Sequence, residues 1–260
     1  MKLKRILIVM LACAALGYTS CKKSSSSQTV DNKTVASQIA VNLAQTLYSG
    51  FGGFNITAGL KAPGTFGMDR NKIRLALSKG RMGVNSLTGD ITCGLKMDTI
   101  INTSIAVDGG QATVVGSIGF TFTCANGVPS GFTTTDNLKV TMATAQINGT
   151  FNVAENLTLA LVNPADTTSN LSLNGTANFA ENAKMNGKST VESFNYTFNN
   201  VIITQLGTIA SGSAAFTTTG SGAQGTWNAS GTITFLGNDT AKLVINGATY
   251  TVNLQTGVVS

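Results

Sequence analysis

An Asp-Gly pair at positions 108–109 lies between two stretches in which apolar and polar residues alternate. Asp-Gly is among the strongest signals for a two-residue β-hairpin loop. With these residues as the loop, the numbers of opposed residues add to 217, which sets Leu95 against Phe122 and Met97 against Phe120. One face of the hairpin is then almost wholly apolar. Because a shift by one residue would turn that face to water, the pattern predicts a single antiparallel register.

The same register places Cys93 opposite Cys124, although the cysteines played no part in choosing it. Opposed Cα atoms in an antiparallel pair lie about 4.5 or 5.5 Å apart, within the usual disulfide range of about 4.4 to 6.8 Å. No other cysteine follows position 21. We therefore predict a Cys93–Cys124 disulfide, the alternative being two free cysteines that pack as small apolar residues.

The C-terminal residues predict a second meander, in which the Asn-Gly pair at 246–247 is the loop and Leu243 opposes Tyr250. A two-residue loop at the preceding turn would set Phe235 against Lys242, an apolar residue against a charged one. That turn therefore requires an odd-length connection with a bulge.

Between these hairpins, residues 147–156 recur as residues 173–182 with seven of ten positions identical. Two copies are too few for a solenoid, so we interpret them as similar strands of one meander. The chain contains 29 Gly and only 11% charged residues, yet 42% hydrophobic residues, which is typical of short strands and turns that enclose a core. The prediction is an all-β antiparallel meander, forming a barrel or sandwich, in a single domain over residues 31–260.

One short amphipathic helix is expected at the start of this domain, at about residues 33–49, capped by Asp31 or Asn32 and ended by Gly50. Apolar residues recur there at every fourth position, so the helix presents one stripe that has to pack against the sheet. The stripe consists of Val35, Ile39, Leu43 and Leu47.

The N-terminus reads as an export signal, because Lys2, Lys4 and Arg5 precede an apolar run at 6–17 that ends near Cys21. Small residues directly before that cysteine fit a lipobox, and the segment resembles those of bacteroidete-type exported lipoproteins. The resemblance implies a signal peptide at 1–20, acyl chains such as palmitate on Cys21 as the membrane anchor, and a flexible tether at 21–30.

Two alternatives remain for this segment, namely cleavage by an ordinary signal peptidase near Ala14 or Ala15, and lipidation of Cys13. In the surface-export signals of such bacteria, acidic residues closely follow the cysteine. Here the first carboxylate is Asp31. We therefore expect the protein at the outer membrane, lipid-anchored and facing the periplasm.

Removal of the signal peptide lowers the formal net charge from +6 to +3, so nucleic acid is not an expected partner. The remaining excess is local, in a cluster that contains one carboxylate, Asp69. The cluster is either a contact for an anionic membrane surface or a solvated strand edge. It consists of Lys61, Arg70, Lys72, Arg74, Lys79 and Arg81.

The sequence contains no histidine, which removes the commonest general base and metal ligand. It also lacks a phosphate-binding Gly loop, a CxxC pair and a calcium loop, so no cofactor and no metal are expected. Most carboxylates are expected at turns or on wet strand faces, which leaves no catalytic pair. Those residues are Asp108, Asp136, Glu155, Asp166, Glu181 and Asp239.

The sequence therefore predicts a noncatalytic cell-envelope lipoprotein with a structural or binding role. The alternative is a carrier of lipid or another amphiphile, because twelve Phe could line an apolar cavity between strands. Sugar-binding platforms need clustered aromatic residues, and the supply here is small, namely Trp227, Tyr48, Tyr196 and Tyr250. Three triplets that begin at Asp98-Thr99, Asp166-Thr167 and Asp239-Thr240 also resemble bacterial O-glycosylation acceptors.

Overall fold

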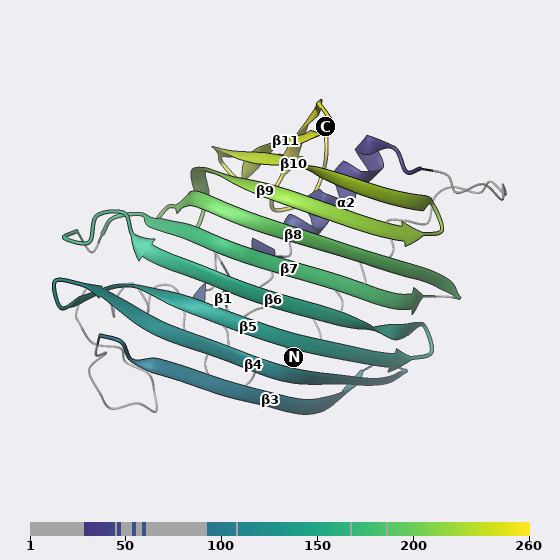
Figure 1. The fold of residues 1–260 in the computed structure, drawn as a ribbon, viewed down its shortest axis with the longest axis horizontal. Coiled ribbons are helices and arrows are strands. Elements are labelled where there is room, and N and C mark those ends of the chain that lie inside the picture. The colour runs from purple at the N-terminus through teal and green to yellow at the C-terminus, as the bar shows by residue number, and fades with distance from the viewer. Residues whose placement is uncertain are drawn as a thin grey trace.

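The main element is a ten-stranded antiparallel sheet in which the order of strands in the sheet is their order in the chain (Figure 1). The computed structural model describes residues 29–44, 46–47, 54–55, 59–60, 93–107, 109–166, 168–185 and 187–260. The strands are β3 Lys96–Val107, β4 Gly110–Ala125, β5 Val128–Thr144, β6 Ile147–Leu161, β7 Leu171–Met185, β8 Lys188–Ile203, β9 Ile209–Gly222, β10 Gly225–Gly237, β11 Thr240–Ile245 and β12 Ala248–Asn253.

The predicted antiparallel meander, with one helix among the described residues, is confirmed, but the sheet is not closed into a barrel. Strands β3 and β12 are its two edges and do not pair with each other. The other described strands, β1 Phe54–Asn55 and β2 Gly59–Leu60, form a separate two-stranded sheet. The ten long strands therefore form one open layer.

The predicted register of the β3–β4 hairpin is confirmed. Met97 pairs with Phe120 and Val107 with Gly110, which is the pairing that the Asp-Gly signal predicts. Gly109 has a φ of 78°, a conformation that an Asp-Gly loop requires of its second residue. Beyond the end of β3 the same register continues through the predicted disulfide, in which the Cα atoms of Cys93 and Cys124 are 5.5 Å apart.

Alternation along each long strand divides the sheet into an apolar face and a polar face. In β5, Phe132, Leu138 and Val140 are buried, whereas Thr135 and Asn137 are exposed. The polar face repeats across neighbouring strands, because exposed Asn and Thr residues are directly opposed there. One such row runs through Thr135, Asn156, Thr176 and Thr197.

The C-terminal meander also has the predicted register. Leu243 opposes Tyr250, and Phe235 opposes Ala241. The register shifts between Phe235 and Gly237, so the predicted bulge is present. The predicted odd-length loop is wrong, because Gly237 pairs with Thr240 and only residues 238 and 239 form the loop. This bulge keeps apolar side chains of β10 and β11 on one face.

Helix α2, Asn32–Ala44, packs against the apolar face of the sheet near its C-terminal strands (Figure 1). Asp31 caps it, because Asp31 Oδ1 accepts a 3.0 Å hydrogen bond from the Thr34 backbone N–H. The predicted stripe is buried, and each of its four residues is at most 2% exposed. The α-helix ends earlier than predicted, and just after it Thr46 Oγ1 donates a 2.9 Å hydrogen bond to the Asn42 carbonyl. Such back-bonding by threonine bends helices.

The repeated segments lie in the neighbouring strands β6 and β7, as expected for a meander. Because these strands are antiparallel, the copies run in opposite directions, and Phe151 pairs with Glu181 while Glu155 pairs with Ala177. Both copies therefore place their glutamate on the same face of the sheet.

Several predicted features lie outside the described residues. These are the signal peptide, Cys21, the tether up to residue 28, Asp108, Tyr48 and the basic cluster of Lys61, Arg70, Lys72, Arg74, Lys79 and Arg81. Within the described residues, helical segments lack the length and hydropathy of a membrane span.

Candidate functional site: paired carboxyl groups beneath helix α2

Asp136 on β5 and Glu155 on β6 are directly opposed, and both lie on the apolar face. Their exposed fractions are 3% and 5%, so the prediction that they lie at turns or on wet faces is wrong. Thr134 Oγ1 donates a 3.1 Å hydrogen bond to Asp136 Oδ1. The structure thus brings two carboxyl groups together inside the core.

A second opposed pair consists of Glu181 on β7 and Glu192 on β8. Glu181 is 9% exposed, which also contradicts its predicted wet position, and Glu192 is partly buried. On one side of this pair, Phe151 of β6 is opposite Glu181. On the other side, Gly220 of β9 is opposite Glu192, and Trp227 of β10 is opposite Gly220. Aromatic residues therefore flank this pair along the sheet.

Burial raises the pKa values of these glutamates because it disfavours the charged form. Burial is the main cause for Glu155, and the charge of Asp136 and a hydrogen bond to Asp136 raise its pKa further. Burial and the nearby Glu192 raise the pKa of Glu181 to about 8. Burial alone raises that of Glu192 to about 7. These groups therefore retain protons far above the pH at which exposed glutamates lose them.

None of the described lysines lies in the core beside these acid pairs, because all of these lysines are exposed. They are Lys33, Lys96, Lys139, Lys184, Lys188 and Lys242. Protonation of the glutamates, which their raised pKa values favour, limits the repulsion within each pair.

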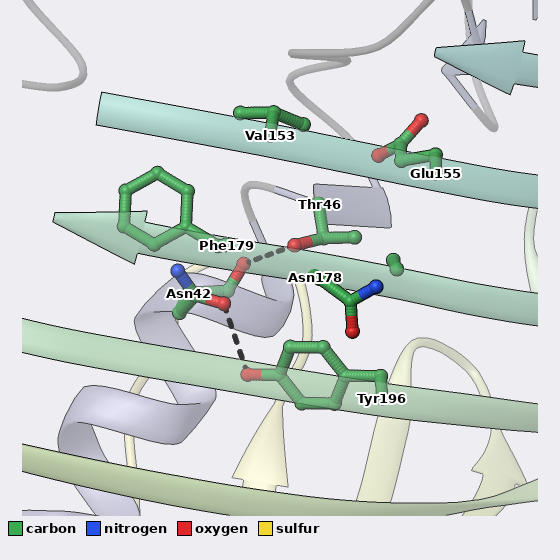
Figure 2. A pocket seen from close by; sticks show the side chains of 8 residues that line it. Asn42, Thr46, Val153, Glu155, Asn178, Phe179 and Tyr196 are labelled. Atoms are coloured by element: carbon green, nitrogen blue, oxygen red, sulfur yellow. Dashed lines mark hydrogen bonds between the residues drawn. The ribbon is translucent and has the colours of Figure 1, made fainter. Parts of the chain in front are cut away.

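A small pocket lies between α2 and the strands β6, β7 and β8 (Figure 2). Its volume is about 20 Å³, measured as the space open to the centres of water molecules, which is enough for about one water. Figure 2 shows Asn42 and Thr46, from the helix side, between the β6 residues and Tyr196 of β8. The lining residues are Asn42, Thr46, Val153, Glu155, Ala177, Asn178, Phe179 and Tyr196.

The polar residues of the pocket also attach the helix to the sheet. The Tyr196 hydroxyl donates to Asn42 Oδ1 at 3.0 Å and is 3.4 Å from the Ile39 carbonyl oxygen. Glu155 Oε2 is buried and has no hydrogen-bond partner. Glu155, a lining residue of the pocket, thus has one unsatisfied acidic oxygen, whereas the Tyr196 hydroxyl is satisfied.

The remaining carboxylates among the described residues have structural or solvent-exposed positions. Asp239 lies at a turn, as predicted, although it is buried there; its Oδ1 accepts from the Ile209 backbone N–H and its Oδ2 accepts from Gln255 Nε2 at 2.7 Å. Asp166 is exposed, as predicted, and its Oδ1 accepts from the Thr168 backbone N–H at 2.8 Å. Asp239 therefore connects turns rather than forming a site.

Sequence reasoning missed the buried acids because it assigned them by residue type. The sequence did contain a signal. Glu155 is two residues from Leu157 and four from Leu159, so in a strand all three side chains lie on the same face. The repeat places Glu181 at the position equivalent to Glu155. Alternation alone could therefore have placed both glutamates on the apolar face.

The other candidate groups do not add a site. Trp227 and Tyr196 are buried core residues rather than a sugar platform. In the described part of the chain, no three His, Cys, Asp or Glu side chains lie close enough together to hold a metal. Of the glycosylation-like triplets, Thr240 is partly buried and donates to the Gly237 carbonyl at 2.7 Å, whereas Thr167 and the side chain of Thr99 lie outside the described residues.

The paired carboxyl groups and the pocket beneath α2 are thus the strongest candidate site among the described residues. Comparison with known proteins provides no precedent for it, because no family model, no curated protein and no solved structure matches the chain.

Proposed function

We propose that the protein is a noncatalytic lipoprotein of the cell envelope, with a structural or binding role at the outer membrane. The supporting observation is that the apolar face of the described sheet is filled. Helix α2 and the strands from β3 to β12 contribute to one continuous cluster of buried apolar residues. The pocket in this region has room for about one water, so a substrate of ordinary size does not fit there.

The arrangement of the acids supports the noncatalytic role. Hydrolysis of a glycoside requires two carboxyl groups on either side of a scissile bond, about 5 to 9.5 Å apart. Asp136 and Glu155 instead share a hydrogen bond and face each other across adjacent strands. A sugar ring cannot enter between them.

The proposed anchor is lipid on Cys21, which would hold the domain at the periplasmic face through a tether at 21–30. Metabolic labelling with a clickable fatty acid tests this proposal. Wild-type protein should carry the label and sediment with membranes, whereas Cys21→Ala should lose both properties. Cys13→Ala is the matched control and should keep them. Label that persists in Cys21→Ala would refute the anchor.

The cluster from Lys61 to Arg81 is proposed as a weak contact for anionic headgroups. Binding of the unlipidated protein to anionic vesicles should then fade as salt shortens the screening length toward about 8 Å. Binding that does not respond to salt would indicate an inserted apolar patch and would contradict this contact.

The second candidate function is a carrier of an amphiphile, and the openness of the sheet favours it. Helix α2 packs on the apolar face of this open sheet, and acyl chains could replace the helix there. Mass spectrometry of lipid extracted with the purified, unlipidated protein distinguishes the two functions. Lipid in stoichiometric amount would establish the carrier, and its absence would favour the structural or binding role.

A further inference from the structure

Strands β3 and β12 are the two edges of the long sheet, and the chain treats them differently. The last residues of the chain close the outer side of β12. Thr251 and Ser260 exchange two backbone hydrogen bonds of 2.9 Å there, and the Asn253 N–H donates to the Val258 carbonyl at 2.9 Å. No described strand pairs with the outer side of β3, which is the lower margin of the sheet in Figure 1. Among the described strands, β3 is therefore the open edge.

The pairing of β3 with β4 shows which of its backbone groups face this edge. The Leu95 carbonyl accepts a 2.9 Å hydrogen bond from the Phe122 N–H, and Val107 pairs with Gly110 at the hairpin end. Backbone groups of alternate residues point to the same neighbour in an antiparallel pair, so the odd-numbered residues of β3 bond to β4. The even-numbered residues of β3 therefore direct their N–H and C=O groups away from β4.

The edge carries little protection against pairing with another strand. Natural sheets protect open edges with charges, proline or bulges. The charged residues of β3, Lys96 and Asp98, lie at its start and form a 3.0 Å ion pair with each other. Residues 99–107 contain no charge and no proline. The register with β4 also runs without a shift along the whole of β3.

An apolar side chain is exposed on this edge strand. Ile100 is 86% exposed, and its opposite residue on β4 is Ser117. The next even-numbered residues, Asn102 and Ser104, are exposed and uncharged. A strand that pairs with β3 would cover Ile100 and satisfy the outward backbone groups at the same time, which favours association.

The sequence of β3 is compatible with antiparallel pairing to itself. Directly opposed residues lie on the same face of a sheet, so the numbers of opposed residues have to add to an even total. With a total of 200, Ile100 opposes Ile100 of the second copy, and Asp98 opposes Asn102. Lys96 then opposes Ser104. The two isoleucines cover each other, and no like charges are opposed.

We propose that β3 is a homodimer interface, in which the β3 strands of two copies pair antiparallel about Ile100 and join two sheets into one. Both copies use the same residues, and the outer sides of both β12 strands are closed, so the assembly ends at two copies. One strand on each side buries less than the about 1,200 Å² of a standard interface, so the expected Kd is about 10 to 100 μM. This proposal does not depend on the lipid anchor or on the carrier function.

Sedimentation velocity of the purified, unlipidated protein tests the proposal, at concentrations between about 1 and 500 μM. Wild type should change from monomer to dimer over this range. Ile100→Lys sets two charges against each other at the centre of the interface and should raise the Kd at least tenfold. Leu206→Lys is the matched control, because Leu206 is 89% exposed and lies between β8 and β9. It should associate like wild type, and both variants should keep the wild-type Tm.

Cysteine cross-linking tests the register. Ile100→Cys should form an intermolecular disulfide on mild oxidation, because opposed Cα atoms would lie about 5.5 Å apart. Ser104→Cys should not, because the two copies of that residue would lie about 27 Å apart along the strands. Both variants also carry Cys13→Ala and Cys21→Ala, which remove competing thiols.

Three results would overturn the proposal. A wild type that is monomeric at every concentration would do so, and would leave the edge of β3 to a strand of another protein. Association that persists unchanged in Ile100→Lys would place the interface elsewhere. Equal cross-linking of the Ile100→Cys and Ser104→Cys variants would contradict pairing about Ile100.

Discussion

Glu181 on β7 and Glu192 on β8 lie directly opposite each other on the face of the sheet that carries the apolar core. The pKa of Glu181 is raised to about 8 and that of Glu192 to about 7. In the unfolded chain the same groups would ionise near the ordinary glutamate value of 4.5. The folded protein therefore holds protons that the unfolded chain has released.

This difference predicts a stability that falls as pH rises. Between about pH 4.5 and pH 8 the unfolded state binds fewer protons, so the free energy of unfolding decreases with pH. Glu181→Gln removes one ionisable member, and we expect it to be more stable than wild type by about 2 to 4 kcal/mol near pH 9 and similar near pH 5. Urea unfolding at both pH values measures this. The exposed control Asp98→Asn should follow wild type, and a Glu181→Gln curve parallel to wild type would contradict the prediction.

The contact between Tyr196 and Asn42 predicts a coupled loss of stability. Tyr196→Phe leaves the buried Asn42 Oδ1 without its donor, and we expect a cost of about 1 to 3 kcal/mol. A double-mutant cycle with Asn42→Ala separates this hydrogen bond from packing, because the second substitution should cost less once the first is present. Strictly additive costs would show that the hydrogen bond contributes nothing to helix docking.

Gly220 lies beneath the indole ring of Trp227, and the close approach leaves no space for a methyl group. A Cβ at Gly220 would lie 1.9 Å from Trp227 Cζ2. Gly220→Ala should therefore displace the ring and cost about 1 to 3 kcal/mol. Gly222→Ala on the same strand is the matched control, since its nearest neighbour would be 3.7 Å away. Fluorescence of this single tryptophan should shift in Gly220→Ala and stay unchanged in Gly222→Ala.

The disulfide closes a loop between residues 31 positions apart. In the chain-entropy account such a bridge contributes about 3 to 4 kcal/mol, because it restricts the unfolded chain. Replacing Cys93 and Cys124 together by Ser should lower the free energy of unfolding by that amount. Non-reducing peptide mapping of the wild type should recover the two cysteines in one linked peptide pair. Alkylation of both thiols under denaturing conditions without reductant would show that the bridge is absent.

The hairpin registers could be predicted because two local signals agree. An Asp-Gly or Asn-Gly loop fixes the pairing, and alternation fixes which face is buried. At 108–109 the two signals independently align Cys93 with Cys124. The openness of the sheet could not be predicted in this way, because closure depends on strand tilt and stagger accumulated over the whole sheet.

The candidate site was harder to predict, since it depends on long-range packing. Asn42 and Tyr196 are 154 residues apart, and no local pattern indicates that they meet. By residue type alone, Glu155 would be assigned to the surface. Only the alternation along β6, which puts Glu155 on the same face as Leu157 and Leu159, indicates that it is buried.

The order of the strands in the chain has a consequence for how the molecule assembles. Each long strand pairs with the one made just before it, so the sheet can grow hairpin by hairpin as the chain is synthesised from its N-terminus. Helix α2 is made before these strands, yet it packs against β11 and β12, and Val30 donates its backbone N–H to the Thr226 carbonyl of β10 at 3.1 Å. We therefore expect this helix to dock last. Pulse-labelled hydrogen exchange during refolding should protect β4 to β6 before α2, and simultaneous protection of all of them would contradict this order.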